Sequence, residues 1–224
     1  MSGKRSPRAK PFDSTWTPAL AWVVGIIATD GCLYGDGRHV AVVSKDRALL
    51  ETVMRCLGWS VCISAHRSGF GGQGPYYRIQ FARAGFYRWL QDIGLTPNKS
   101  KIIGALAIPD EVFEDFLRGC FDGDGSCYAY YDPRWPKSYL FYWELCSGSP
   151  TFIKWVRQRI QELAGPHGHI SRGGGVEILK YAKREAVVLF EKMYADKQAP
   201  CLLRKREKVD QIMRTWCNLV ATQG

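Results

Sequence analysis

The sequence predicts an α+β fold made of two similar units, and three observations lead to this expectation. A nine-residue pattern occurs twice, at 23–31 and 117–125, and each copy is a largely apolar run that ends in Asp-Gly. The same alternation of helix-like and strand-like segments accompanies each copy, an internal repeat of roughly a hundred residues. A hydrophobic content of 46% with 8 Trp, 11 Tyr and 10 Phe indicates a packed globular chain. We therefore expect two pseudo-symmetric αββαββα units, each with an antiparallel sheet, that pack through the motif helices.

Each copy of the pattern carries two small residues four positions apart. These are Gly25 and Thr29 in the first copy, and Gly119 and Gly123 in the second. Residues four apart lie on one face of a helix, so each pair forms a stripe at which another helix backbone can approach closely. If the two stripes face each other, the aspartates that follow them lie side by side at the helix ends. A larger side chain at Gly119 is then expected to destabilise the whole protein.

The first unit is expected to span residues 17–108, after a flexible basic tail at 1–16. Thr17 and Pro18 supply an N-cap and a first-turn proline, so the motif helix should begin there. It has no charged residue from Ala19 to Thr29, which indicates a buried helix. The remaining elements are expected as strand-like runs ending at 39–44, a helix at 46–57, a hairpin at 61–66 and 76–82, and a helix at 85–93.

The second unit is expected to span 109–224 and to repeat this order with drift. Its motif helix should begin at Asp110, and its charged residues Glu114, Arg118 and Asp122 share one face. We therefore expect this helix to be more exposed than its counterpart, and Asp122 to pair with Arg118. The other elements are expected as a hairpin at 127–131 and 139–146, a helix at 149–164, a hairpin at 169–171 and 176–182, a helix at 184–194, and a last amphipathic helix from about 203.

The paired pattern resembles that of the LAGLIDADG homing endonucleases, whose family name spells the nine-residue motif. The match holds at both glycines and at the acid in both copies, and it would cover about residues 17–215. The resemblance implies two sheets that form a saddle over double-stranded DNA, in a monomer with internal pseudo-two-fold symmetry. It also implies a metal-dependent, staggered double-strand cut and a role in the mobility of an intron or similar element. The differences between the two units predict a long, non-palindromic target.

Asp30 and Asp124, the acids of the two motifs, are the predicted catalytic and metal-binding residues. Phosphodiester hydrolysis needs an activated water and neutralisation of developing charge, which divalent metals held by carboxylates supply. Mg²⁺ prefers few protein carboxylates together with water and phosphate oxygens, so we expect Mg²⁺ or another divalent ion such as Mn²⁺. The resemblance also implies a basic residue near each metal, for which Lys99 and Lys205 are candidates; either could instead be a phosphate contact or a surface charge.

The predicted DNA contacts come from the sheets and from the basic composition. The net charge of +10 and the pI of about 9.3 favour an acidic partner, and both halves of the chain carry a basic excess. Strand alternation at 76–81 directs one residue in two away from the core. Arg and Gln on such a strand can read guanine and adenine edges. The candidate DNA-binding residues are Tyr76, Arg78, Gln80, His39, His66, Arg67, Tyr128, Tyr130, Arg134, Lys137, Arg172 and Lys180, the last being the counterpart of Gln80, while Tyr128 and Tyr130 would be core residues in the other strand register.

Several other features of the sequence are assigned ordinary roles. Ser44 and Ser147 precede the second helix of each unit, where the family often has a water-holding residue and where a turn also favours serine. The G-x-G-x-x-G pattern at 69–74 is followed by a proline and a strand, so we interpret it as a hairpin link. The eight cysteines contain no C-x-x-C pair, and we expect reduced thiols and no zinc site. The first and last residues carry no signature of a self-splicing intein.

Two alternatives to an endonuclease stay open at this point. One is a non-catalytic DNA-binding regulator on the same fold, and the other is an RNA-binding maturase. No apolar run approaches the roughly 18 residues of a membrane span, and the basic first residues lack the apolar core of a secretory signal. We therefore expect no membrane partner and an intracellular location, in the cytoplasm or nucleoid of a prokaryote or phage host, or in an organelle.

Overall fold

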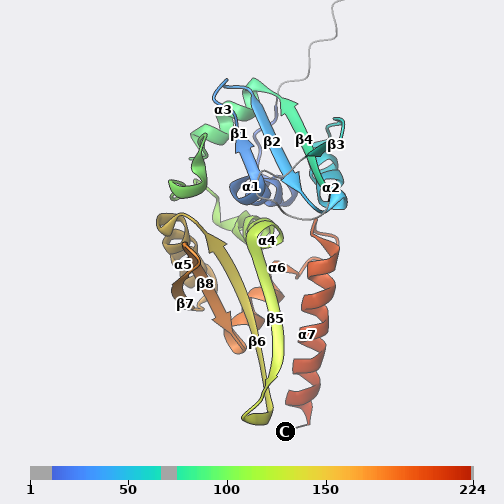
Figure 1. The fold of residues 1–224 in the computed structure, drawn as a ribbon, viewed down its shortest axis with the longest axis vertical. Coiled ribbons are helices and arrows are strands. Elements are labelled where there is room, and N and C mark those ends of the chain that lie inside the picture. The colour runs from blue at the N-terminus through green and yellow to red at the C-terminus, as the bar shows by residue number, and fades with distance from the viewer. Residues whose placement is uncertain (1–11, 67–74, 223–224) are drawn as a thin grey trace, which may run out of the picture.

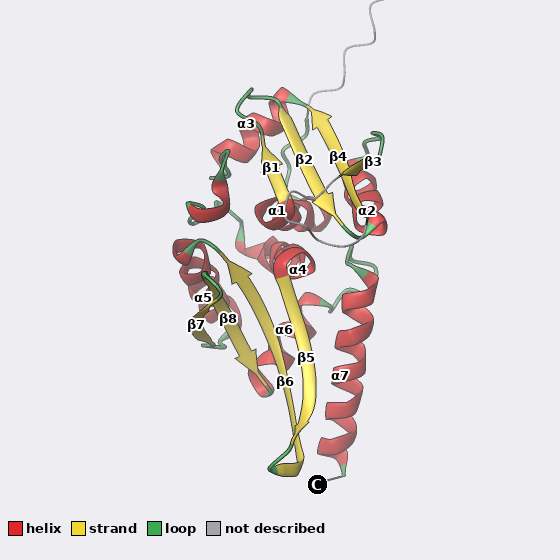
Figure 2. Cartoon of the chain, viewed as in Figure 1, coloured by secondary structure: helices red, strands yellow, loops and turns green. Residues whose placement is uncertain are grey.

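A computed structural model describes residues 12–66 and 75–222. The described chain forms two units of the same element order, each built on a four-stranded antiparallel sheet with helices packed against one face (Figures 1 and 2). The two motif helices lie between the two sheets. The predicted α+β class with two pseudo-symmetric units is confirmed, and no helix in the described ranges is long and apolar enough to cross a membrane.

The first unit has the sheet order β1-β2-β4-β3. Its motif helix begins as predicted, because Pro18 is the first helical residue and the Thr17 hydroxyl accepts a hydrogen bond from the Leu20 amide at 3.1 Å. Gly58 ends the second helix in a left-handed conformation, with φ +63°. The elements are α1 (Pro18–Asp30), β1 (Gly31–Leu33), β2 (His39–Ser44), α2 (Arg47–Leu57), β3 (Ser64–His66), β4 (Tyr76–Ala82), α3 (Ala84–Asp92) and the short η1 (Lys99–Lys101).

The second unit has the equivalent sheet order, β5-β6-β8-β7. Its elements are η2 (Asp110–Val112), α4 (Phe113–Asp124), β5 (Gly125–Asp132), β6 (Trp135–Ser147), α5 (Pro150–Ala164), β7 (His169–Gly173), β8 (Val176–Ala182), α6 (Arg184–Met193) and the long α7 (Leu203–Ala221). The β5–β6 hairpin is longer than the expected 127–131 and 139–146, because pairing continues until Asp132 meets Trp135. Only Pro133 and Arg134 form the turn, so most of residues 132–138, which the expected strand bounds left between the strands, belong to the strands themselves.

The motif helices α1 and α4 pack against each other through the two small-residue stripes. A Cβ atom added at Gly25 would lie 2.7 Å from the Cys120 amide nitrogen and 2.8 Å from the Gly119 Cα. A Cβ atom at Gly119 would lie 3.0 Å from the Gly25 Cα and would also overlap the Trp22 carbonyl oxygen. No larger residue fits at either position, so the predicted facing stripes are confirmed.

The expectation that the second motif helix, α4, is more exposed than α1 was wrong. Arg118 is 2% exposed, and its guanidinium donates hydrogen bonds to the Met193 carbonyl at 2.6 Å and the Pro200 carbonyl at 2.9 Å, besides pairing with Asp115. The charged face of α4 is therefore covered by the end of α6 and the segment that follows it. Sequence spacing showed the charged stripe but could not show that a later helix would cover it.

The expected pairing of Asp122 with Arg118 is also corrected. Asp122 is buried, and its Oδ2 accepts hydrogen bonds from the Trp22 indole nitrogen at 2.9 Å and the Leu202 amide at 2.8 Å. Its side chain therefore joins α4 to α1 and to the start of α7. The two side chains do not pair because the Arg118 guanidinium binds backbone carbonyls near the end of α6, whereas the Asp122 carboxylate binds the Trp22 indole and the Leu202 amide.

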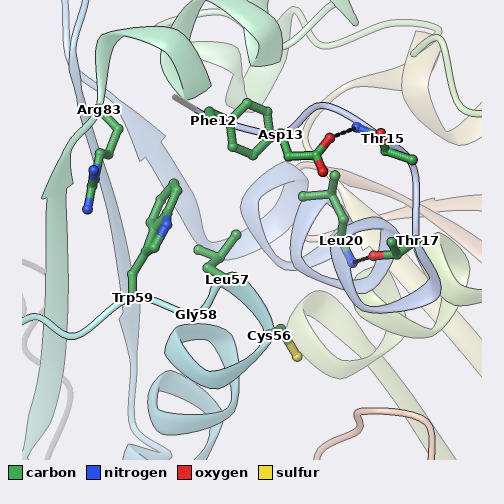
Figure 3. Close-up of a pocket in the computed structure, with 10 residues that line it drawn as sticks. All are labelled: Phe12, Asp13, Thr15, Thr17, Leu20, Cys56, Leu57, Gly58, Trp59 and Arg83. Carbon is green, nitrogen blue, oxygen red and sulfur yellow. Dashed lines mark hydrogen bonds between the residues drawn. The ribbon is translucent and has the colours of Figure 1, made fainter. Parts of the chain in front are cut away.

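The last residues of the predicted basic tail belong to the first unit. Phe12 lies 4.9 Å from Phe86 and 5.2 Å from Trp89 between ring centroids, and Trp16 lies 5.0 Å from Trp89. The expectation of a flexible tail is thus corrected for residues 12–16, because aromatic burial fixes them. Residues 1–11 lie outside the described ranges. Beside this segment is a cavity of 490 Å³ that Trp59 and Arg83 also line (Figure 3).

Candidate active site

Asp30 and Asp124 are the last residues of the two motif helices, and the packing of those helices brings them together. A Cβ atom at Gly123 would lie 2.8 Å from the Thr29 Cβ and 3.4 Å from the Asp30 Oδ2. The Asp30 carboxylate therefore lies against the backbone of the other motif. Neither aspartate forms an ion pair with a described residue, and neither has a hydrogen bond that stabilises its charge.

This arrangement makes the charged form of the two acids unfavourable. Burial, followed by the nearby charge of Asp124, raises the pKa of Asp30 from 3.8 to about 7. Burial also raises the pKa of Asp124, against the opposing effect of Lys99 and Lys205. Two carboxylates in a shared, partly desolvated place form a site whose charge a bound cation would relieve.

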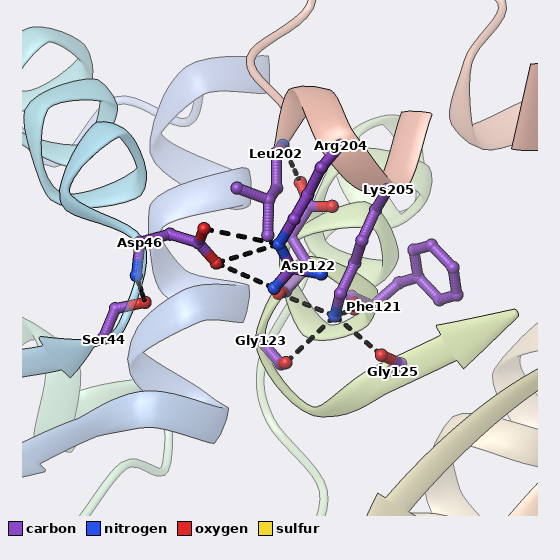
Figure 4. A network of polar contacts seen from close by, with 9 residues as sticks. All are labelled: Ser44, Asp46, Phe121, Asp122, Gly123, Gly125, Leu202, Arg204 and Lys205. Atoms are coloured by element: carbon purple, nitrogen blue, oxygen red, sulfur yellow. Dashed lines mark hydrogen bonds and ion pairs between the residues drawn. The ribbon is translucent and has the colours of Figure 1, made fainter. Parts of the chain in front are cut away.

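Lys205 occupies the first turn of α7 and caps the end of α4. Its three N–H groups are shared among four carbonyl oxygens, those of Phe121 at 2.6 Å, Asp122 at 2.8 Å, Gly123 at 3.1 Å and Gly125 at 2.6 Å from Nζ (Figure 4). The carbonyls at a helix C-terminus carry partial negative charge, so this is a favourable place for a cation. Burial nevertheless lowers the pKa of Lys205.

Lys99, in η1, occupies the equivalent place in the first unit with fewer contacts. Its Nζ donates to the Thr29 carbonyl at 3.3 Å, and the residue is 4% exposed. Burial lowers the pKa of Lys99 as well. The two candidate lysines therefore do lie at the motif ends, but they are unequal, since Lys205 satisfies four carbonyls and Lys99 one.

For each motif acid, the lysine of the other unit has the larger effect on the pKa. Among the basic groups that lower the pKa of Asp30, Lys205 has the larger effect and Lys99 the smaller. For Asp124 the order is reversed, and Lys99 has the larger effect. The site is therefore assembled from both units, and its charge balance depends on their packing.

Two contacts that sequence reasoning missed position the lysine-bearing segments. Arg204, next to Lys205, forms an ion pair with Asp46 at 2.7 Å, which joins α7 to the N-terminus of α2 in the first unit (Figure 4). In the equivalent place, the Ser149 hydroxyl at the start of α5 donates to the Ile103 carbonyl at 2.5 Å. Each unit thus holds the segment that carries the other unit's lysine. Asp46 and Ser149 are the equivalent N-cap residues of α2 and α5, and this equivalence is the sequence feature that could have pointed to both contacts.

The two serines proposed as water-holding residues take part in local turns. The Ser44 hydroxyl accepts a hydrogen bond from the Asp46 amide, and the Ser147 hydroxyl accepts one from the Ser149 amide, each at 3.1 Å. These contacts fix the approach to α2 and α5. They are the turn contacts that are an ordinary structural reason for serine at these positions.

The predicted DNA-reading strand of the first unit alternates as expected. Ile79 and Phe81 of β4 are buried, while Arg78 and Gln80 are half-buried on the opposite face. Tyr76 is on that face too, and its ring has the Lys45 Nζ 5.1 Å from its centroid. The structure therefore gathers three of the candidate residues on one face of the first sheet.

Several other candidate residues are engaged in ion pairs within the chain. Lys180, which sheet register places as the counterpart of Gln80, pairs with Glu144 at 2.6 Å. Arg134 pairs with Asp132 at 3.4 Å and Arg172 with Glu177 at 3.8 Å. Tyr128 and Tyr130 lie on β5. The other candidates are His39, which pairs with Asp36, the half-buried His66 of β3, the exposed Lys137, and Arg67, which lies outside the described residues.

The donor atoms at the motif ends are the two aspartate carboxylates, which fit the expected divalent metal. Among the described residues no group of three or more His, Cys, Asp or Glu side chains is placed to hold a metal ion. The site offers two carboxylates, and Mg²⁺ commonly takes one or two carboxylates with water and phosphate oxygens completing its shell. The chemistry of the two acids therefore fits a hard divalent cation shared with a phosphate-bearing substrate.

The fold and the paired carboxylates define a two-unit α+β protein with one composite acidic site. The same arrangement of elements occurs in solved structures of the LAGLIDADG fold. The meganuclease I-AabMI bound to uncleaved DNA superposes with a TM-score of 0.63 and 15% identity, over 92% of this chain and 92% of that one. The homing endonuclease I-WcaI bound to its DNA recognition sequence gives 0.60 and 14%, over 92% and 95%.

The fold is also shared with a second kind of protein. The full-length DUF199/WhiA protein from Thermatoga maritima superposes with a TM-score of 0.56 and 16% identity, over 88% of this chain. This chain spans 60% of that protein's length. The N-terminal LAGLIDADG domain of DUF199/WhiA, solved by itself, superposes with a TM-score of 0.55 and 16% identity, over 86% of each chain. A scan against protein-family models and a search of curated proteins found no match. At these identities the comparisons show the LAGLIDADG fold.

Proposed function

We propose that this protein is a metal-dependent DNA endonuclease that makes a staggered double-strand cut at a long, non-palindromic site. The observation that carries the proposal is the pair of motif aspartates. They lie together at the ends of two facing helices, they have no ion-pair partner among the described residues, and burial raises the pKa of both. An unpaired acidic pair destabilises a fold, so a ligand-binding role explains its presence better than a structural one.

Asp30 and Asp124 would hold the divalent cation, Mg²⁺ or Mn²⁺. A cation bound there would neutralise charge on a phosphate and make a bound water more acidic. Lys99 and Lys205 each lower the pKa of both acids and so favour the ionised carboxylates that ligation requires. The contacts of Asp46 and Ser149 hold the lysine-bearing segments in place.

The proposed substrate is double-stranded DNA, bound by one copy of the chain. The net charge of +10 supplies attraction to phosphates, and Arg78 and Gln80 of the first sheet carry groups that can pair with guanine and adenine edges. The likeness to I-AabMI and I-WcaI, both solved on DNA, supports this choice. We include in the proposal an intracellular role in the mobility of an intron or similar element.

A non-catalytic DNA-binding protein is the second candidate. One observation favours it: DUF199/WhiA is not named as an endonuclease, and the likeness to it is of similar quality to the likeness to the endonucleases. Both candidates predict binding to duplex DNA, and they differ in whether the two motif acids act on a phosphodiester. Cleavage is therefore the measurement that separates them.

The test is cleavage of a randomised duplex library in Mg²⁺ or Mn²⁺ by the parent, by Asp30→Asn and by Asp124→Asn. Asp92→Asn, which changes an exposed acid at the end of α3, is the matched control. We expect one enriched site of about 20 base pairs, cut by the parent and the control and lost or only nicked in the two motif variants. Site-specific binding without cleavage under several metals would reject the endonuclease and favour the regulator.

A further inference from the structure

Three tyrosines form a continuous aromatic group on the outer face of the second sheet. We call Tyr128 and Tyr130 of β5 and Tyr142 of β6 the tyrosine ladder. Tyr128 lies directly opposite Tyr142 in the sheet register, with ring centroids 5.1 Å apart. Tyr130 lies 6.5 Å from Tyr128, with rings inclined by 5°, and 6.2 Å from Tyr142. The alternate residues Phe141 and Trp143 are buried, so the ladder occupies the opposite, outer face.

One end of the ladder is fixed by polar contacts. The Lys180 Nζ lies 5.1 Å from the Tyr142 ring centroid and 5.7 Å from that of Tyr128, and it donates to the Tyr128 hydroxyl at 3.0 Å. Glu144 neutralises this lysine at 2.6 Å and accepts a hydrogen bond from the Tyr128 hydroxyl at 2.8 Å. The other end is open, because Tyr130 is 44% exposed.

The equivalent face of the first sheet has different chemistry. Tyr34 follows the first motif acid at the same distance as Tyr128 follows the second, but its ring meets His39 edge-on, at 6.3 Å and 78°. Arg78 and Gln80 provide hydrogen-bonding groups on that sheet. The first sheet thus offers polar groups to base edges, whereas the second offers parallel aromatic faces with a neutralised cation.

The tip of the β5–β6 hairpin carries further exposed side chains. Trp135 is 70% exposed, and the Arg134 side chain next to it is 83% exposed. Tyr131 alternates with Tyr130 and lies on the other face of the sheet, where its ring centroid is 5.2 Å from that of Tyr139. Lys137 of β6 is exposed as well. The hairpin runs beside α7 to the lower end of the molecule, and β1 and β2 of the first unit are much shorter strands (Figure 1).

We propose that the tyrosine ladder and this hairpin tip bind unpaired nucleotides of a single-stranded nucleic acid. Aromatic rings on a sheet stack on the faces of unstacked bases, and nearby cations hold the phosphates between them. A duplex presents base edges in its major groove. The ladder offers few groups that could read those edges, because Lys180 beside it is already paired with Glu144. The proposal does not depend on cleavage, and it adds a second kind of ligand to the molecule.

The test measures binding in excess EDTA, where no metal-dependent cleavage interferes. Labelled strands of about twelve nucleotides, as single-stranded DNA, single-stranded RNA and the matching DNA duplex, are titrated and followed by fluorescence anisotropy. The variants are the double substitutions Tyr130→Leu with Tyr142→Leu and Tyr130→Phe with Tyr142→Phe. Tyr34→Leu is the matched control from the first unit, and Trp135→Ala tests the exposed tip where no packing is at risk.

We expect the double leucine variant to lose about tenfold or more in affinity for a single strand, since stacking contributes that much per base. The double phenylalanine variant and Tyr34→Leu should bind like the parent, and Trp135→Ala should also lose single-strand affinity. Stronger binding of RNA or of single-stranded DNA would identify the natural source of the unpaired nucleotides. Unchanged single-strand binding in the leucine variant, or an equal loss for the duplex, would overturn the proposal.

Discussion

Two aspartates at the end of the same pair of helices have different environments. Asp122 is buried, and its Oδ2 accepts hydrogen bonds from the Trp22 indole and the Leu202 amide, while its Oδ1 has no partner within residues 12–66 and 75–222. Burial raises its pKa to about 6, and those hydrogen bonds oppose the rise. Asp30 has neither a hydrogen bond nor an ion pair with the described part of the chain, and its pKa rises further. Asp122 therefore connects elements of the fold, whereas the Asp30 charge is unfavourable until a ligand arrives.

Asp30→Asn should stabilise the protein in the absence of metal, more strongly at pH 8 than at pH 5. Between pH 3.8 and about 7 the folded protein binds more protons at Asp30 than the unfolded chain, so the free energy of unfolding falls as pH rises through this window. An asparagine at position 30 does not ionise, so it removes this fall in the free energy of unfolding. We expect a gain on the order of 1–3 kcal/mol at pH 8, or several degrees in Tm, measured by thermal unfolding in EDTA.

Asp36→Asn is the control of opposite sign. Hydrogen bonds from the His39 side chain and backbone lower the pKa of the exposed Asp36 carboxylate to about 2, so its charged form stabilises the fold and is lost only at low pH. This substitution should lower Tm at pH 8. An Asp30→Asn variant that melts at or below the parent's Tm at pH 8 would show that the acid is not destabilising.

At the scale of elements, the close contact of α1 with α4 determines where both motif ends lie. Helix α1 is buried from Leu20 to Ala28, so its packing comes from apolar side chains on all sides and not from one stripe. The glycine stripes then set the distance, because they allow backbone to lie against backbone. The two acids meet as a result of this distance.

Gly119→Ala should therefore destabilise the whole protein. Its new Cβ would overlap the Trp22 carbonyl oxygen and lie 3.0 Å from the Gly25 Cα, contacts that only a backbone shift can relieve. We expect a loss of about 2 kcal/mol or more, measured by denaturant unfolding. Gly35→Ala is the matched control, since a Cβ there meets nothing within 4 Å. Equal stability of the two variants would contradict the close approach.

At the scale of the whole molecule, the two units exchange supporting contacts. Arg204 of α7 binds Asp46 of the first unit, and Ser149 of the second unit binds the Ile103 carbonyl. Trp22 of the first unit donates to Asp122 of the second. The motif helices add a shared apolar interface, in which residues from both units form one continuous core. The units therefore depend on each other for folding as well as for the site.

The protein should unfold in one cooperative transition. Breaking either unit would expose the apolar surface of α1 or α4, which makes a half-folded state unfavourable. Far-ultraviolet circular dichroism and tryptophan fluorescence should report the same denaturant midpoint. Two separated midpoints would show instead that the units are stable alone and that the interface contributes little.

The expected element order was confirmed because it depends on local chemistry. Thr17 and Pro18 start α1, Gly58 ends α2, and apolar alternation in β4 selects its core face. The errors arose where distant segments decide. The charged face of α4 was expected to be exposed, but α6 and the chain near Pro200 cover it, and Arg118 binds carbonyls there.

The sequence by itself determined the two-unit α+β fold, the glycine stripes and the position of Asp30 and Asp124 at the motif ends, because each follows from a short-range pattern that occurs twice. The packing of the two units made the stripes face each other. The tertiary structure alone decided which lysine acts on which acid, the Asp46–Arg204 ion pair and the tyrosine ladder as a stacked group. These contacts depend on electrostatic and packing distances between residues far apart in the chain. Local spacing carries no information about those distances until the two units have packed.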